Sequence, residues 1–167
     1  MIEQCSSRVQ MTFRRAGWYV GRSVDLSRLE YWFSLDKVPR LTFADGILRE
    51  TYGLVVDFAP GGPYSKASFD AIDVLSHMPG YDIKLLSEHV GVDLCPIGEF
   101  PENILFVGRN QEFYVLNGLF ADVHQIASVH EALEWLCDRS YDAQKATHRL
   151  PRHLIELFDL EEYPRET

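Results

Sequence analysis

The residues best suited to chemistry in this chain are His130, Glu131 and Glu134, which form the pattern His-Glu-x-x-Glu. On a helix this spacing places an imidazole and a carboxylate on adjacent turns, where they could hold a zinc ion for hydrolysis. Ser128 and Glu131, however, have the spacing of a capping box, in which Glu131 belongs to the first turn of a helix. His124 lies six residues before His130, and no matching Cys or Asp supplies a third ligand. We expect helix capping, with a metal-dependent hydrolase as an alternative.

The three cysteines are the other candidates for nucleophilic or metal chemistry. A catalytic thiol needs a nearby base or cation that lowers its pKa, whereas Cys95 precedes Pro96 and is flanked by apolar residues. We expect a buried structural cysteine at this position. Cys5, Cys95 and Cys137 are too widely spaced for a disulfide framework or a zinc cluster, which favours a reducing cytoplasm. The sequence therefore predicts no catalytic residue, no metal and no cofactor.

A loop rich in glycine and proline, residues 60–63, precedes Ser65 and Lys66 and is superficially like a phosphate-binding loop. Its spacing does not match that motif, Pro63 lacks an amide donor, and no helix follows at once. We expect a loop without a phosphate site.

Length and composition fit one globular domain. The chain has 167 residues, of which 46% are hydrophobic and 13% aromatic, enough for a single packed core. The first thirty residues contain no long apolar run, and Arg14 and Arg15 interrupt the best candidate. We therefore expect neither a secretion signal nor a membrane span.

The net charge of −9 is concentrated in the middle of the chain. Residues 1–30 carry five basic against three acidic side chains, residues 31–138 six against sixteen, and residues 139–167 five against six. Such an acidic field repels nucleic acid and anionic membranes and favours a basic partner. A need for solubility would explain the same charge equally well.

Hydrophobic periodicity predicts four helices in the first half of the chain and one strand between the second and third of them. The helices cover residues 25–33, 43–52, 71–77 and 82–90, and the strand covers residues 54–58. The side chains expected to cap the four helices are Asp25, Thr42, Asp70 and Asp82.

The second and fourth of these helices are predicted in most detail. Their inward-facing residues are expected to be Phe43, Ile47 and Leu48, and Ile83, Leu86 and Val90, respectively. Gly53 and Gly91 follow these helices, where a left-handed residue is favoured.

The second half of the chain changes to a strand pattern after Leu94. Residues 104–107 are continuously apolar, as in a strand covered on both faces, and residues 112–116 return across a turn at 109–111. Residues 119–126 predict another strand, and the Ser128 capping box opens a helix. Pro151 begins a further amphipathic helix. We expect a single α+β domain with a largely antiparallel sheet, helices packed on it and a C-terminal helical extension.

Three short stretches, taken in order, resemble a known family. The first is residues 16–22 with Gly17, Trp18, Gly21 and Arg22, the second is residues 95–108 with Pro96, Ile97, Gly98, Glu99 and Gly108, and the third is residues 130–136. Their order and spacing resemble the SUKH superfamily of immunity proteins, in particular its third subfamily. The resemblance covers about residues 16–138. It implies that residues 1–138 form a SUKH-like immunity domain and that residues 139–167 are an extension.

Two side chains of these stretches have more than one possible role. Trp18 and Arg22 are spaced for a cation–π pair, although Gly21 between them makes a turn equally plausible. Glu99 follows Gly98 and could accept backbone amides or face a partner.

The resemblance implies a bacterial protein that binds and neutralises a cognate polymorphic toxin domain, commonly a nuclease in such systems, by occlusion. It implies no enzyme activity, and a SUKH-like regulatory or scaffold domain is the alternative. Acidic residues in loop-rich segments are the expected contacts, because a nuclease presents a basic cleft, and two tyrosines are possible anchors. These predicted contacts are Asp57, Asp70, Asp73, Asp82, Glu88, Asp93, Tyr64 and Tyr81.

Overall fold

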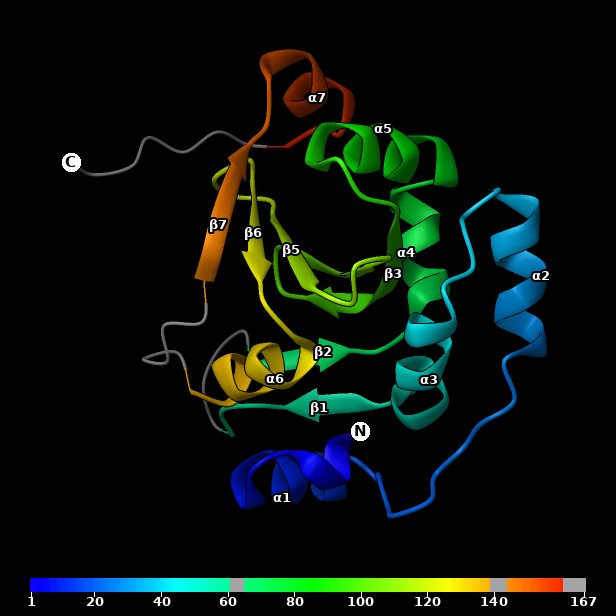
Figure 1. The fold of residues 1–167 in the computed structure, drawn as a ribbon, viewed down its shortest axis with the longest axis vertical. Helices are drawn as coiled ribbons and strands as arrows, with labels where there is room; N and C mark the ends of the chain where they lie inside the picture. Colours follow the sequence, from blue (N-terminus) through cyan, green and yellow to red (C-terminus); the bar gives the residue numbers. More distant parts are fainter. Residues whose placement is uncertain (61–64, 139–143, 161–167) are drawn as a thin grey trace.

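The computed structural model describes residues 1–60, 65–138 and 144–160. The molecule is built on a seven-stranded sheet in which each strand lies beside, and antiparallel to, the strand before it in the sequence (Figure 1). The strands are β1 (Val55–Asp57), β2 (Lys66–Ser68), β3 (Leu94–Phe100), β4 (Asn103–Gly108), β5 (Phe113–Asn117), β6 (Asp122–Ile126) and β7 (Gln144–Arg149). The predicted α+β class with a largely antiparallel sheet is confirmed.

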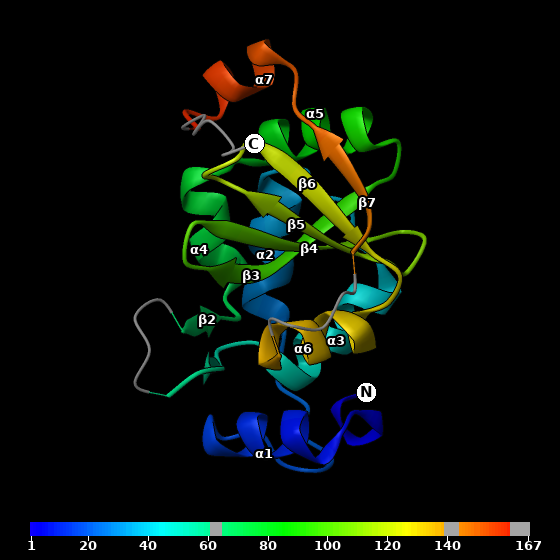
Figure 2. The same ribbon diagram turned by 90° about the vertical axis from the view of Figure 1, so that its left-hand side faces the viewer.

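Helices surround the sheet on several sides. They are η1 (Ile2–Gln4), α1 (Ser7–Arg15), α2 (Ser27–Leu35), α3 (Thr42–Thr51), α4 (Ala71–His77), α5 (Gly80–Val90), α6 (Val129–Cys137) and α7 (Arg152–Leu157). Figures 1 and 2 show α1 and α6 at the end of the molecule that holds the N-terminus, with α5 and α7 at the opposite end. α2 is outermost and packs on α4. Among the described residues, no helix is both long and apolar enough to cross a membrane.

The central hairpin of β4 and β5 is the most deeply buried part of the sheet. Leu105, Phe106 and Val107 are fully buried, so both faces of β4 are covered at this level. Phe106 lies opposite Tyr114, and Val107 lies opposite Phe113. The predicted hairpin and its doubly covered strand are therefore confirmed.

Two of the five predicted caps, Asp70 and Ser128, are confirmed as N-caps, whereas Asp25 lies one residue before the N-cap of α2, Leu26. Asp70 accepts a hydrogen bond from the backbone N–H of Ile72 at 3.0 Å, and Ser128 accepts one from that of Glu131 at 3.2 Å. Asp25 accepts the N–H of Ser27 at 3.1 Å, and this bond, together with one from the Ser27 hydroxyl, lowers the pKa of Asp25. α2 begins at Ser27, two residues after Asp25.

The other two predicted caps are wrong. α3 starts at Thr42 itself and has no side-chain cap. α5 starts at Gly80, so Asp82 lies in its first turn instead of before it. The close approach of α5 to the end of α2 explains this earlier start, because a Cβ on Gly80 would lie 1.8 Å from the backbone oxygen of Asp36. That contact is tertiary and leaves no local signal in the sequence.

The inward face of α3 differs from the prediction at one position. Ile47 and Leu48 are buried as expected, but Phe43 is exposed, and Ala44 and Thr51 complete the buried face. These four buried residues have the i, i+3, i+4, i+7 spacing of one helical face, which excludes Phe43.

The predicted helix ends agree with the structure, whereas two later strands differ from the prediction. Gly53 and Gly91 have left-handed φ values of +79° and +82°, as expected. β6 begins at Asp122, three residues later than the predicted strand. β7 is an addition, because the sequence analysis predicts no strand after residue 138, whereas α7 is the expected C-terminal helix.

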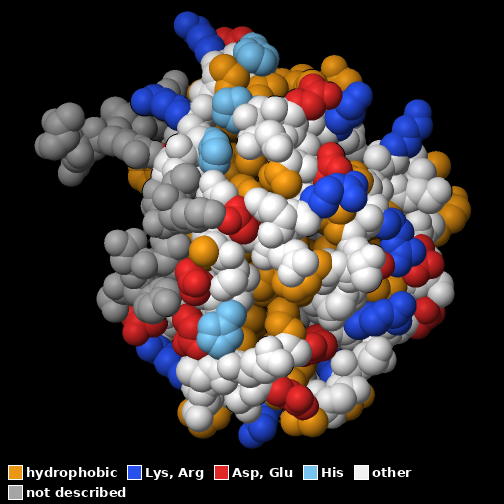
Figure 3. All heavy atoms as spheres, viewed as in Figure 1, with side chains coloured by type: hydrophobic (Ala, Val, Ile, Leu, Met, Phe, Trp, Pro, Cys, Tyr) orange, Lys and Arg blue, Asp and Glu red, His pale blue; other side chains and the backbone are white. Residues whose placement is uncertain are grey.

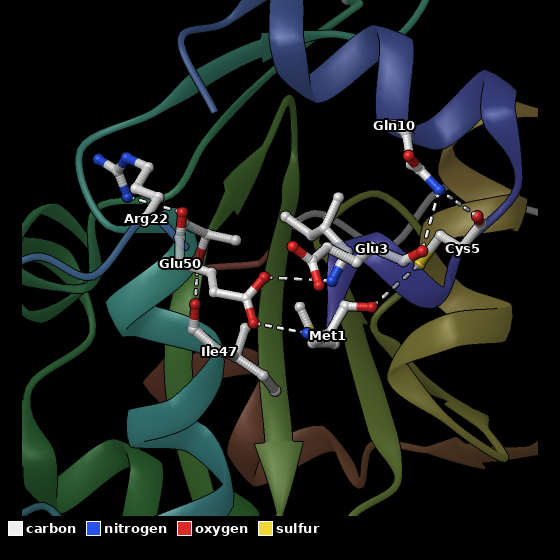
Figure 4. A network of polar contacts seen from close by, with 9 residues as sticks. Met1, Glu3, Cys5, Gln10, Arg22, Ile47 and Glu50 are labelled. Atoms are coloured by element: carbon white, nitrogen blue, oxygen red, sulfur yellow. Dashed lines mark hydrogen bonds and ion pairs between the residues drawn. The ribbon is translucent and has the colours of Figure 1, made fainter. Parts of the chain in front are cut away.

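The first motif stretch joins two distant segments. Arg22 donates to the backbone oxygens of Glu50 at 2.6 Å and Tyr52 at 2.9 Å, where α3 ends and its carbonyls lack helical partners (Figure 4). Of the two alternatives for Trp18 and Arg22, the cation–π pair is therefore not the one found. Arg14 lies over the buried indole instead, at 6.0 Å from the ring centroid, and Trp18 lies in the turn after α1, where its backbone N–H donates to the backbone oxygen of Phe13 at 2.9 Å.

The glycines of the second motif stretch allow close packing. A Cβ on Gly98 would lie 2.2 Å from the backbone oxygen of Ser68, so β2 approaches β3 only because this residue has no side chain. A Cβ on Gly108 would lie 2.7 Å from the ring of Tyr114. Pro96 and Ile97 are buried beside a bulge in β3.

Candidate partner-binding groove

One row of side chains crosses five strands at the same level. Val55, Ser68, Glu99, Ile104 and Leu116 come from β1 to β5, and each lies opposite the next in the antiparallel register. Opposed residues in such a ladder project from the same face of the sheet. The row therefore forms a continuous, largely apolar track.

This track is the floor of a groove of about 400 Å³, which we call the sheet groove. Its lining is completed by Lys66, His77, Phe100, Pro101, Glu102, Asn103, Gly118 and Leu160. Val55 is 56% exposed, whereas the neighbouring Val56, on the opposite face, is fully buried. The sheet is thus covered on one face at β1 and open on the other.

α4 supplies the side wall that carries charge. Its start is fixed by the Asp70 cap, and its last residue, His77, places Nε2 at 3.4 Å from Oε2 of Glu99. The Glu99 side chain is 39% exposed, and its carboxylate therefore borders both the imidazole and the groove. Glu99 could accept backbone amides or face a partner, and the surface position of its carboxylate fits the second role.

The turn between β3 and β4 forms the other wall. Glu102 has a left-handed φ of +63°, and its backbone oxygen accepts the N–H of Gly118 at 2.7 Å. Asn103 donates its side-chain amide to the backbone oxygen of Pro101 at 2.6 Å. These two bonds fix the turn, so the exposed Glu102 side chain projects from an ordered backbone.

Most of the predicted partner-binding acids already have local partners. Oδ1 of Asp57 accepts bonds from the Ser65 hydroxyl at 2.6 Å and the Ala59 N–H at 3.2 Å. Asp70 caps α4, as described above. Asp93 binds Arg109 at 2.7 Å, and Glu88 lies 3.8 Å from Lys84.

The remaining predicted contacts differ in exposure. Asp73 on α4 and Tyr81 on α5 are exposed, Tyr81 by 65%. Asp82 is partly buried, and this burial raises its pKa. Tyr64 lies outside the described residues. On the face drawn in Figure 3, acidic and basic side chains are intermixed around hydrophobic atoms, so this face carries no uniform acidic field.

The His-Glu-x-x-Glu stretch has a structural role. Both carboxylate oxygens of Glu134 are engaged by Ser6, whose N–H donates at 2.9 Å and whose hydroxyl donates at 2.8 Å. These bonds tie α6 to the start of α1. His130 is exposed in the first turn of α6. In the part of the chain that the structure describes, no three His, Cys, Asp or Glu side chains are grouped as metal ligands.

The cysteines are buried and His124 is partly buried. All three cysteines are free, and burial raises the pKa of Cys5 and Cys137 to about 11 and that of Cys95 still further. Thiols with such pKa values are poor nucleophiles at neutral pH. His124 faces the fully buried Asp122, with Nε2 3.1 Å from Oδ1.

Sequence reasoning missed most of the groove. Of the groove residues, the sequence predicts Glu99 alone as a possible partner contact. Lys66 is considered only with the rejected phosphate loop and Ile104 only as part of a buried strand, and Val55, His77 and Leu160 are not assigned to a site. One signal was available for Val55, because the run from Leu54 to Val56 is apolar at consecutive positions. In a strand, consecutive apolar residues imply apolar side chains on both faces, and one of those faces is uncovered here.

Comparisons with known proteins place no further constraint on the groove. No family model matches the chain, and neither a curated protein nor a solved structure matches it.

Proposed function

We propose that this protein is an immunity protein that binds a cognate toxin domain in the cytoplasm and blocks it by occlusion, using the sheet groove. The observation that carries the proposal is the sheet groove itself, whose lining includes the exposed Val55 and the partly buried Ile104. An apolar groove bordered by charged groups is typical of a protein interaction surface. The resemblance of the three sequence stretches to SUKH immunity proteins supports the same function.

The chemistry of the groove suits binding better than catalysis. Three of the five floor residues are aliphatic, and the polar side chains of Lys66, His77, Glu102 and Asn103 line the groove outside the floor, as in the rim of a protein interface. The histidine it contains, His77, has Nε2 3.4 Å from Oε2 of Glu99 and Nδ1 3.5 Å from the Ser76 hydroxyl. That hydroxyl donates its proton to the backbone oxygen of Asp73 at 2.6 Å, so it is not arranged as a nucleophile activated by His77. Occlusion requires only a tight fit over the active surface of the toxin.

Co-expression with the toxin domain encoded beside this gene tests the proposal. The wild-type protein is expected to restore growth and to bind the purified toxin domain. Val55→Glu places a charge on the open floor and is expected to weaken binding at least about tenfold, since a buried unpaired charge is costly at an interface.

Leu35→Glu is the matched control. Leu35 on α2 is 57% exposed, nearly the same as Val55, and lies outside the groove lining. Its substitution is expected to leave binding unchanged. The unfolding midpoint of each variant shows whether it is folded. A wild-type protein that neither binds nor protects would exclude immunity, and equal effects of the two substitutions would exclude the groove.

A further inference from the structure

Several acids of this protein are neutralised by a lysine or arginine of the same chain, whereas, within residues 1–60, 65–138 and 144–160, the carboxylates of the sheet groove are not. Asp93 is neutralised by Arg109 at 2.7 Å, and Glu156 by Arg152 at 2.8 Å. Arg40 forms ion pairs with both Glu30 and Asp45, and Arg8 forms one with Asp138 at 2.9 Å. Such internal pairs leave little charge for a partner.

Glu99 and Glu102 have no such cation. Over the described residues, no Lys or Arg side chain lies within ion-pair distance of either carboxylate. Glu99 borders the imidazole of His77 at 3.4 Å, and Glu102 is exposed on the fixed β3–β4 turn. Two unneutralised carboxylates therefore border one apolar groove.

The single lysine of the groove limits where a partner's positive charge can lie. Lys66 lies opposite Asp57, on the same face of β2 as Ser68 and two residues away from it. A uniformly basic partner would be repelled there, whereas a single cation directed at Glu99 and Glu102 would be attracted. The pattern therefore favours a partner with an isolated positive charge next to apolar groups.

We propose that the sheet groove binds a segment of the toxin in which an apolar side chain is followed closely by an arginine or lysine. The apolar side chain lies on Val55 and Ile104, and the cation is directed at Glu99 and Glu102. This inference rests on the proposed function, since it specifies the partner of the same groove. A guanidinium is well suited to the site because it can bond two carboxylates at once.

The test compares two double variants, each of which removes two negative charges. Glu99→Gln with Glu102→Gln alters the groove, and Glu88→Gln with Asp93→Asn alters acids that have partners on or beside α5. Binding of the adjacent toxin domain is measured by surface plasmon resonance across a salt series. The groove pair is expected to weaken binding at least about tenfold and to flatten the salt dependence, and the α5 pair less than about twofold.

The outcomes separate this inference from the proposed function. If the wild-type protein does not bind the toxin domain, the proposed function fails. If it binds and the groove pair has no effect, immunity stands and the cation site is wrong. If the α5 pair has the larger effect, the cation is bound near α5 and the inference is also wrong.

A second measurement identifies the partner residue. Each exposed arginine and lysine of the toxin domain is changed to glutamine and tested against wild-type protein and the Glu99→Gln, Glu102→Gln variant. Substitution of one toxin residue is expected to weaken binding to the wild-type protein but not to the variant, which is the signature of a direct pair. Additive losses at every position would overturn the inference.

Discussion

The sheet groove and a second apolar cavity are similar in size but differ in how their carboxylates are satisfied. The second cavity, of about 410 Å³, lies between the N-terminal residue, α3 and the β4–β5 turn and is lined by Met1, Thr42, Phe43, Gly46, Ile47, Glu50 and Gln111. We call it the α3 cavity. In it, Glu50 accepts bonds from the ammonium group of Met1 at 2.6 Å and the N–H of Ile2 at 3.1 Å (Figure 4).

Glu99 in the sheet groove has a weaker arrangement, with one imidazole at 3.4 Å. A carboxylate that holds two segments of its own chain contributes to stability, whereas one that borders an open apolar floor is available to another molecule. The partners of the charged group, more than the size of the hollow beside it, therefore separate the structural joint at Glu50 from the proposed binding surface at Glu99.

The largest expected difference is in the free energy of unfolding when a glycine near each region, Gly98 or Gly46, is changed to alanine. Gly98→Ala should lower the free energy of unfolding by about 3 kcal/mol or more, because the new Cβ would meet the backbone of β2 at 2.2 Å. Gly46→Ala in α3 should raise it by about 0.5–1 kcal/mol, because nothing lies within 4 Å and alanine favours the helix. Urea denaturation of both variants checks the signs, and a mild loss for Gly98→Ala would contradict the close approach.

Thiol labelling should distinguish local from global opening of the two regions. Burial, together with the charge of Glu134, raises the pKa of Cys5 from 9.0 to about 11, which lowers its thiolate fraction about a hundredfold at pH 8. Cys95 on β3 is more deeply buried and its pKa is raised further. Ellman's reagent should therefore label both at least about a hundredfold more slowly in the folded protein than in urea, with Cys95 slower than Cys5. Rapid labelling of Cys95 without denaturant would show that β3 opens locally.

The two carboxylates should respond differently to neutralisation. Glu50→Gln should cost about 1–3 kcal/mol of stability, since charged hydrogen bonds to Met1 and Ile2 are weakened. Glu99→Gln should change stability by less than about 0.5 kcal/mol, because its pair with His77 is half-exposed. Thermal unfolding of both variants at pH 7 measures this difference. Equal losses would remove the distinction between joint and binding surface.

The smallest expected effect concerns a site outside both regions. Ser128→Ala removes the acceptor for the Glu131 N–H and should cost about 0.5–2 kcal/mol of stability, without weakening toxin binding. Both quantities are measured on the same preparation. A variant that kept its unfolding midpoint but no longer protected cells would place the interface at the start of α6 instead of in the sheet groove.

Local patterns in the sequence account for much of the fold. Continuous apolar residues at 104–107 predicted the buried β4, and Asp70 and Ser128 predicted helix starts, because each signal acts within a few residues. Asp82 failed as a cap, since Gly80 at the start of α5 lies against the end of α2, and Thr42 failed because α3 already begins at that residue. Of the groove residues, sequence reasoning selected Glu99 alone.

The sequence by itself determined the α+β class, the central hairpin and the apolar content of the strands, because periodicity and capping are local properties. Only the tertiary structure decided that Val55, Glu99 and Leu116 lie in one row, since that row depends on the register of five strands. It also decided which acids are neutralised, because the partners of Asp93 and Glu50 lie 16 and 49 residues away along the chain. A count of charges in the sequence cannot make that distinction, since it depends on which side chains the fold brings within reach of one another.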